Sequence, residues 1–74
     1  MIETGIYKHY KGNLYEVIGV AHHSETLEEM VVYRALYKSQ LGENSLWVRP
    51  LKMFIEYVEN NGEKVKRFEL IKQS

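Results

Sequence analysis

The sequence of 74 residues contains no cysteine, no aspartate and only one proline, and its formal net charge is zero. Without cysteine, neither disulfides nor thiolate metal sites can stabilise the fold, whereas small secreted domains usually depend on them. No stretch approaches the roughly 18–20 apolar residues that span a bilayer. The N-terminal residues 1–7 also lack the basic start and apolar run of a signal peptide. We therefore expect a cytoplasmic protein without membrane contact.

The ten basic and ten acidic residues are distributed unevenly along the chain. Residues 1–37 hold three basic and five acidic side chains, which gives −2, and the remainder holds seven and five, which gives +2. Proteins that hold nucleic acid mainly through its phosphates usually carry a much larger basic excess. The composition argues against a nonspecific nucleic-acid binder but leaves room for a local arginine cluster.

The hydrophobic fraction of 45%, with six Tyr, two Phe and one Trp, suffices for one core, so we expect a single domain over residues 1–74. Gly, Asn and Pro divide the chain into short segments rich in Val, Ile, Tyr and Phe, a pattern typical of an antiparallel meander. The predicted strands are Gly5–Tyr10, Leu14–Ala21, Met30–Tyr37, Ser45–Arg49, Ile55–Glu59 and Glu63–Ile71.

Two of these assignments depend on local chemistry. Glu28–Leu36 has some helical propensity, but consecutive β-branched and aromatic residues favour a strand there. Its two faces are predicted to hold Val31, Tyr33, Ala35 and Tyr37 on one side and Met30, Val32, Arg34 and Leu36 on the other. Pro50 has no N–H to donate to a sheet and suits a first helical position, so residues Pro50–Phe54 predict one helical or 3₁₀ turn. A loose turn is expected at Gly42–Asn44.

Asn61-Gly62 between two apolar runs is the strongest short hairpin signal, because a type I′ turn needs positive φ at both central residues. A two-residue loop there places Glu59 opposite Lys64, Val58 opposite Val65, and Glu56 opposite Arg67. Glu56 and Arg67 then share a face with the two valines, which predicts a half-buried ion pair. Together the segments predict an all-β fold, a small five-stranded SH3-like barrel.

Several consecutive motifs resemble a bacterial family, the domain of unknown function 1653. The resemblance rests on residues 5–12 (GIYKHYKG), 23–28 (HSETLE), 31–33 (VVY) with 36–37 (LY), 46–54 (LWVRPLKMF) and 65–68 (VKRF). It implies an SH3-type β-roll, and it implies no particular activity because none is established for the family. Two positions depart from the family's usual residues: His22 replaces a frequent arginine, and Lys66 replaces a frequent proline.

The densest polar segment runs from His22 through His23, Ser24 and Glu25 to Thr26. Ser, Glu and Thr in a connection between strands commonly bond to nearby backbone and shape the turn. The functional alternative is a ligand loop that presents two imidazoles and a carboxylate on a rigid β scaffold.

A metal site would need His9, His22, His23 and Glu25 to meet, but adjacent histidines on a strand point to opposite faces. A hydrolase would pair Ser24 with His9 or His22, without a nucleophile elbow and without any aspartate. We therefore predict no metal, no cofactor and no catalytic residue, with a small hydrolase or metal-dependent enzyme as a remaining alternative.

Trp47 and Arg49 alternate on one face of their strand. They form either a core residue with its charged neighbour or a patch that holds a carboxylate, phosphate or base. Arg34, Arg49 and Arg67 come from three segments and would form an anion site if they converged. The tyrosines are either half-buried strand residues or a groove for an extended peptide.

The sequence identifies no ligand. It favours a noncatalytic module that recognises a peptide, a protein or a small anionic ligand, with a single-stranded nucleic-acid-binding barrel as the alternative. The predicted ligand-binding residues are His22, His23, Ser24, Glu25, Thr26, Tyr33, Trp47, Arg49, Glu56 and Arg67.

Overall fold

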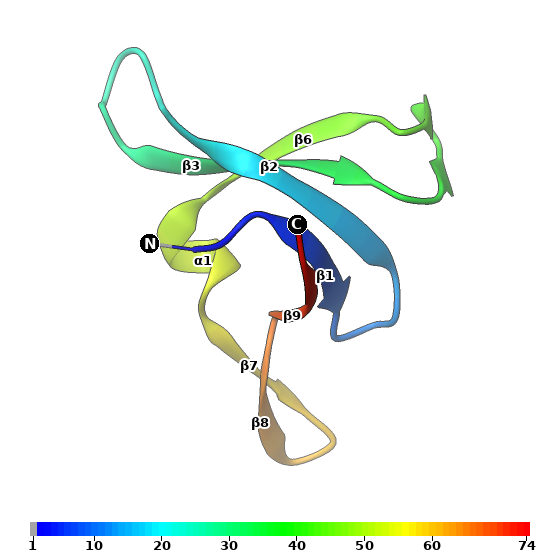
Figure 1. The fold of residues 1–74 in the computed structure, drawn as a ribbon. Coiled ribbons are helices and arrows are strands. Elements are labelled where there is room, and N and C mark those ends of the chain that lie inside the picture. Colours follow the sequence, from blue (N-terminus) through cyan, green and yellow to red (C-terminus); the bar gives the residue numbers. More distant parts are fainter. Residues whose placement is uncertain (1) are drawn as a thin grey trace.

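The computed structural model describes residues 2–74; Met1, which the predicted domain includes, lies outside them. One antiparallel sheet of five strands dominates, in the order β6-β3-β2-β1-β9 (Figure 1). Its strands are β1 Gly5–His9, β2 Leu14–His22, β3 Glu29–Ala35, β6 Leu46–Pro50 and β9 Phe68–Gln73. The all-β class and the five-stranded sheet are confirmed, whereas closure into an SH3-like barrel stays a prediction.

Two short hairpins and one helix lie outside the main sheet. β4 Lys38–Ser39 pairs with β5 Gly42–Glu43, and β7 Tyr57–Asn60 pairs with β8 Glu63–Lys66. The helix α1, Leu51–Phe54, follows β6 at the predicted helical turn. Figure 1 shows the β7–β8 hairpin at the bottom of the molecule and the β2–β3 loop at its upper left. Within the described part of the chain, no helix is long and apolar enough to cross a bilayer.

Segment Glu29–Ala35 is a strand, and the predicted alternation of its faces is confirmed. Val31, Tyr33 and Ala35 are buried, while the side chains between them point to the other face. The segment forms a strand and not a helix because β-branched and aromatic residues pack well on a pleated, half-buried surface.

The hairpin register is confirmed. Val58 pairs with Val65 and Glu59 with Lys64. Asn61 and Gly62 both have positive φ, 53° and 83°, as a type I′ turn requires.

Several predicted boundaries are wrong: β3 ends at Ala35 instead of Tyr37, and β7 begins at Tyr57 instead of Ile55. Glu63–Ile71 is two strands, because the N–H of Arg67 donates to the Glu56 carbonyl at 3.1 Å while its own carbonyl accepts from the Tyr10 N–H at 3.0 Å. Arg67 thus carries the chain from the hairpin to the main sheet. Pro50 ends β6 instead of stopping the strand before it, and it is tolerated because β6 is an end strand. The loose turn at residues 42–44 contains part of the short β4–β5 hairpin.

The core lies on the inner face of the curved sheet and is mainly aromatic. Phe54 of α1 stacks on Phe68 of β9 with ring centroids 4.1 Å apart and planes 2° apart. Tyr7 and Tyr33 meet Phe54 edge to face, each at 5.5 Å. The cluster of buried residues is Tyr7, Val17, Val31, Tyr33, Phe54 and Phe68. A helix of four residues is therefore enough to bring one large side chain into the centre of the fold.

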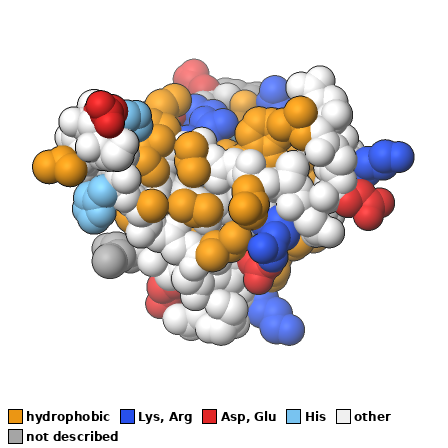
Figure 2. Space-filling model, turned by 90° about the horizontal axis from the view of Figure 1, so that it is seen from above, with side chains coloured by type: hydrophobic (Ala, Val, Ile, Leu, Met, Phe, Trp, Pro, Cys, Tyr) orange, Lys and Arg blue, Asp and Glu red, His pale blue; other side chains and the backbone are white. Residues whose placement is uncertain are grey.

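The outer face of β2, β3 and β6 is apolar but exposed to solvent. Val48 and Leu46 of β6 are 60% and 59% exposed, and Ile18 of β2 is 44% exposed. Figure 2 shows hydrophobic side chains gathered in a band across this upper face. The apolar residues of β2 therefore lie on one buried and one exposed face, with Val17 on the first and Ile18 on the second.

Candidate functional site

The inner faces of the two end strands of the sheet meet at Arg49 of β6 and Phe68 of β9. The Arg49 guanidinium carbon lies 5.8 Å from the centroid of the Phe68 ring. The Arg49 Nε donates a long hydrogen bond of 3.5 Å to the Tyr33 hydroxyl. We call this group, with the side chains described next, the seam cluster; it comprises His9, Tyr33, Arg49, Glu56, Arg67 and Phe68.

Arg67 reaches the seam from the junction between β8 and β9. Its Nη2 donates to the Glu56 Oε1 at 2.6 Å, with the side chains 21% and 41% exposed, so the predicted half-buried ion pair is confirmed. The buried Arg67 Nε has no hydrogen-bond partner among residues 2–74. Arg49 forms no ion pair with any described residue. The cluster therefore holds two guanidinium groups against one carboxylate.

His9 adds a neutral hydrogen-bond donor to the cluster. Its Nδ1 accepts the Lys11 N–H at 3.1 Å, so the neutral ring carries its proton on Nε2. Burial lowers the pKa of His9 from its ordinary value of 6.5, and the positive charges of Arg67, Arg49 and Lys11 lower it further. The ring also meets Phe68 edge to face at 4.9 Å, which fixes it against the core.

Aromatic side chains form the wall of the seam. The Tyr15 ring meets Phe68 and Tyr33 edge to face, at 5.5 and 5.3 Å. The Tyr15 hydroxyl is 2.9 Å from the Tyr37 hydroxyl, and burial followed by this hydrogen bond raises the pKa of Tyr15 above its usual 10.0. The tyrosine hydroxyl here is a hydrogen-bonded neutral group at physiological pH.

Trp47 lies on the same inner face as Arg49, directly across from Tyr33 on the neighbouring strand. It is half-buried against the core, and its Nε1 donates to the Ser45 hydroxyl at 2.8 Å. Arg34 does not join the other two arginines, because it points to the outer face and pairs with Glu16 at 3.0 Å. Arg49 and Arg67 both lie close enough to His9 for their charges to lower its pKa, so two of the three arginines are near the same side chain.

The His22–Thr26 segment lies apart from the seam at the tip of the β2–β3 hairpin (Figure 1). Its polar groups are bonded to one another: the His23 Nδ1 accepts from the Glu25 N–H at 3.1 Å, and Ser24 donates to the Glu25 carboxylate at 3.0 Å. No hydrogen bond or ion pair within residues 2–74 joins this loop to Arg49 or Arg67. The loop thus has the local bonding of a turn-shaping segment.

The residues of the metal and hydrolase alternatives do not gather. Ser24 has no histidine partner in the described chain. Among residues 2–74 there is also no group of three or more His or Glu side chains placed to share an ion. The third histidine, His9, is held in the seam instead.

The cluster offers donors and few acceptors: two guanidinium groups, a tyrosine hydroxyl and an imidazole N–H. Such a set complements acceptor-only groups, namely carboxylates and phosphates. Sequence reasoning missed His9 and Phe68 as parts of this site. The alternation of β1, which puts His9 on the inner face with Tyr7, is the signal that could have identified the histidine.

Two comparisons place the chain among known proteins. The family described as protein of unknown function, DUF1653, matches residues 5–70, a range that contains the whole seam cluster. A protein of that family from Bordetella bronchiseptica, known from its crystal structure, is 33% identical and superposes with a TM-score of 0.87. The similarity covers 99% of this chain and 91% of that one. No protein with a curated description matches the sequence.

Proposed function

The chain belongs to the DUF1653 family, and on that premise we propose that it is a noncatalytic binding module whose seam cluster takes the carboxylate or phosphate group of a peptide or small molecule. The observation that carries the proposal is the Arg49 guanidinium. It is half-buried, it lies over an aromatic ring, and it has no acidic partner among the described residues.

A half-buried guanidinium gains more from a bound anion than an exposed one. Solvent screens it less, and its planar set of donors can bind both oxygens of a carboxylate at once. Arg67 strengthens the attraction because Glu56 offsets only one of the two positive charges. Neutral His9 contributes a donor without adding a third charge.

Trp47 gives the site an apolar flank on which the rest of a ligand can pack. In this proposal Glu56 holds Arg67 in place and does not contact the ligand. The predicted loop residues His22–Thr26 would touch only the distant part of an extended peptide, since they lie at the far end of the β2–β3 hairpin.

An NMR titration of the isotope-labelled chain tests the proposal through the Nε–Hε signals of Arg49, Arg67 and Arg34. Sodium acetate, inorganic phosphate and a short peptide with a free or an amidated C-terminus serve as probes. We expect the Arg49 and Arg67 signals to shift with saturation while the Arg34 signal stays in place. A shift with acetate and the free peptide, but not with the amidated one, identifies a carboxylate; a shift with phosphate alone identifies a phosphate ligand.

Arg49→Gln should weaken this binding by about 10–100-fold, because one hydrogen bond to a charged group contributes roughly 1.5–3 kcal/mol. Arg34→Gln is the matched control and should leave the affinity unchanged, since Arg34 lies on the outer face. Equal losses in both variants, or shifts spread evenly over the chain, would show that the seam is not a binding site.

A further inference from the structure

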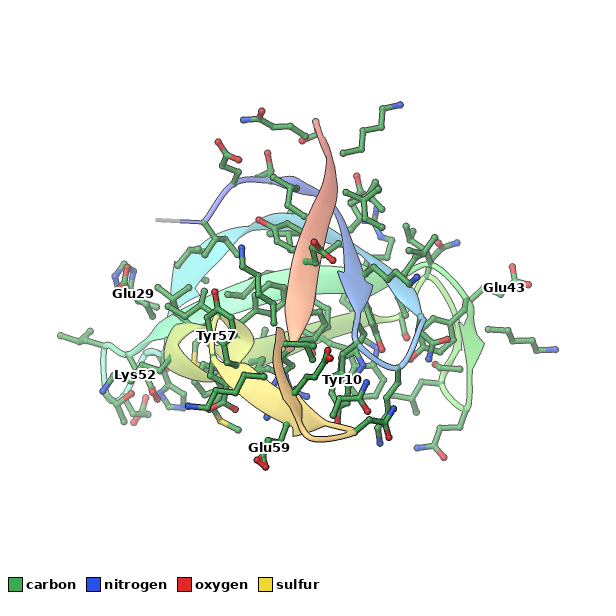
Figure 3. The ribbon with its side chains drawn as sticks, turned by 90° about the horizontal axis from the view of Figure 1, so that it is seen from below. Tyr10, Glu29, Glu43, Lys52, Tyr57 and Glu59 are labelled. Carbon is green, nitrogen blue, oxygen red and sulfur yellow. The ribbon has the colours of Figure 1, made fainter. Side chains whose placement is uncertain are left out.

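A second basic surface lies outside the seam, between the end of β1, the β7–β8 hairpin and the start of β9. It surrounds a cleft of about 420 Å³, which we call the lysine cleft. Figure 3 looks onto this lower side of the molecule, with Tyr10 and Tyr57 labelled beside the hairpin. The lining residues used below are Lys8, Tyr10, Tyr57, Lys64, Lys66 and Glu69.

The charge of the cleft is positive although the chain is neutral. Three lysines line it; Glu69 lies across from Lys8 in the sheet and Glu59 lies across from Lys64 in the hairpin, which leaves an excess of one positive charge. None of these lysines forms an ion pair within the described residues, where the two ion pairs both involve arginine. Three exposed ammonium groups around one hollow attract a ligand that carries several negative charges.

The cleft also has aromatic walls. Tyr57 is 59% exposed, and the β7–β8 register places it opposite Lys66 on the same face of the hairpin. Tyr10 packs against the His9 ring, with centroids 4.6 Å apart and planes 32° apart, and the Lys11 ammonium lies 5.9 Å from the centroid of the Tyr10 ring. An exposed aromatic side chain beside unpaired lysines is the arrangement with which proteins bind the bases and phosphates of a single strand.

We propose that the lysine cleft binds single-stranded nucleic acid, with Lys8, Lys64 and Lys66 on the phosphates and Tyr57 and Tyr10 stacked on the bases. A single strand is favoured over a duplex because aromatic side chains stack only on bases whose faces are free. The proposal concerns a surface other than the Arg49 site, although His9 lines both.

Fluorescence anisotropy with an eight-nucleotide oligo(dT) or oligo(U) tests this. Three phosphate contacts predict a slope of about −2 for log K against log salt, so the affinity should fall about 20-fold between 50 and 200 mM salt. The triple variant K8A/K64A/K66A should lose this binding. The matched control K38A/K52A/K72A removes the same charge outside the cleft and should retain it.

Base stacking distinguishes a site for single-stranded nucleic acid from a surface that binds any polyanion. Tyr57→Ala should weaken oligonucleotide binding about tenfold or more, while Tyr57→Phe should keep it, because the ring rather than the hydroxyl stacks. Heparin, which has charge but no bases, should bind equally to wild type and Tyr57→Ala. Chemical-shift mapping on the wild-type protein gives a readout that needs no variant, with the largest shifts expected in β7, β8 and Tyr10.

Any of four results would overturn the proposal: no binding at 20 mM salt, equal losses in both triple variants, unchanged oligonucleotide affinity in Tyr57→Ala, or duplex DNA bound as tightly as the single strand. Arg49→Gln should leave oligonucleotide affinity unchanged, so the outcome here is independent of the seam site.

Discussion

The ion pair between Glu56 and Arg67 should stabilise the fold more than the ion pair between Glu16 and Arg34. Both are single N–O contacts, of 2.6 and 3.0 Å. They differ in surroundings, because the Arg67 side chain is 21% exposed and each side chain of the other pair is 38% exposed. Because both pairs join one arginine to one glutamate, comparing them shows how burial changes the strength of an ion pair.

The expected magnitudes follow from this difference. Exposed ion pairs typically couple by about 0.2–1 kcal/mol, and we assign that range to Glu16–Arg34. A hydrogen bond between charged groups away from solvent contributes about 1.5–3 kcal/mol, and the 41% exposure of Glu56 reduces this to an expected coupling of about 1–2 kcal/mol. Removing Glu56 also leaves the Arg67 guanidinium half-buried without its carboxylate, so Glu56→Ala alone should cost as much.

Double-mutant cycles with alanine at both pairs, read by urea unfolding, measure the two couplings directly. The m-value for a chain of this size is about 1 kcal/mol per M. The expected Glu56–Arg67 coupling therefore makes the shift of the urea midpoint in the double mutant differ by roughly 1–2 M from the sum of the two single-mutant shifts. In about 1 M salt the coupling of Glu16 to Arg34 should nearly vanish while most of the other persists. The reasoning is refuted if the Glu56–Arg67 coupling is no larger than that of the outer pair.

Three further predictions concern the backbone, the core and a titrating group. Gly5→Ala should cost about 1–3 kcal/mol, because φ at Gly5 is 144° and a Cβ there would clash with the Lys72 carbonyl oxygen; an unchanged urea midpoint would contradict this. Phe54→Ala should cost about 3–5 kcal/mol of the roughly 4–11 kcal/mol expected for this length, whereas the exposed Ile55→Ala should cost little; thermal melts by circular dichroism compare them. The pKa of His9 is lower in the folded than in the unfolded chain, so the unfolded chain binds the proton more tightly. The contribution of neutral His9 to the free energy of unfolding is therefore complete above pH 6.5 and is lost as the pH falls through the pKa of His9 in the folded chain. His9→Gln should therefore flatten the decrease in urea midpoint between pH 7.5 and 5, and an equally steep decrease would contradict the assignment.

The features predicted correctly are those that neighbouring residues determine. Alternation along β3 identified the buried face, and the Asn61-Gly62 turn fixed the pairing of Glu59 with Lys64. Each of these depends on φ preferences or on contacts only a few residues apart. The same alternation already placed Arg34 on the outer face, away from Tyr33, so its exclusion from the arginine cluster was implicit in the sequence.

The features missed are those that depend on a third element. The break in the C-terminal segment at Arg67 arises because Tyr10 and Glu56 bind its backbone from two sides. The meeting of Arg49 with Phe68 depends on how far the sheet curls between its end strands, which pairwise strand patterns do not encode. Sequence could therefore name Arg49 as a site residue, but only the structure places it over the Phe68 ring.

The zero net charge also conceals how the charges are arranged. Two of the three arginines are offset by Glu16 and Glu56. Glu25 and Glu28 lie in the β2–β3 loop and Glu29 at its edge, which Figure 1 shows far from the β7–β8 hairpin where the lysine cleft lies. The molecule measures 37 × 26 × 25 Å, several times the screening length of about 8 Å at physiological ionic strength. An anion at the cleft therefore interacts with its three lysines and with the nearby Glu59 and Glu69, and hardly at all with the glutamates of the β2–β3 loop, so the neutral composition of the whole chain does not exclude a local positive excess.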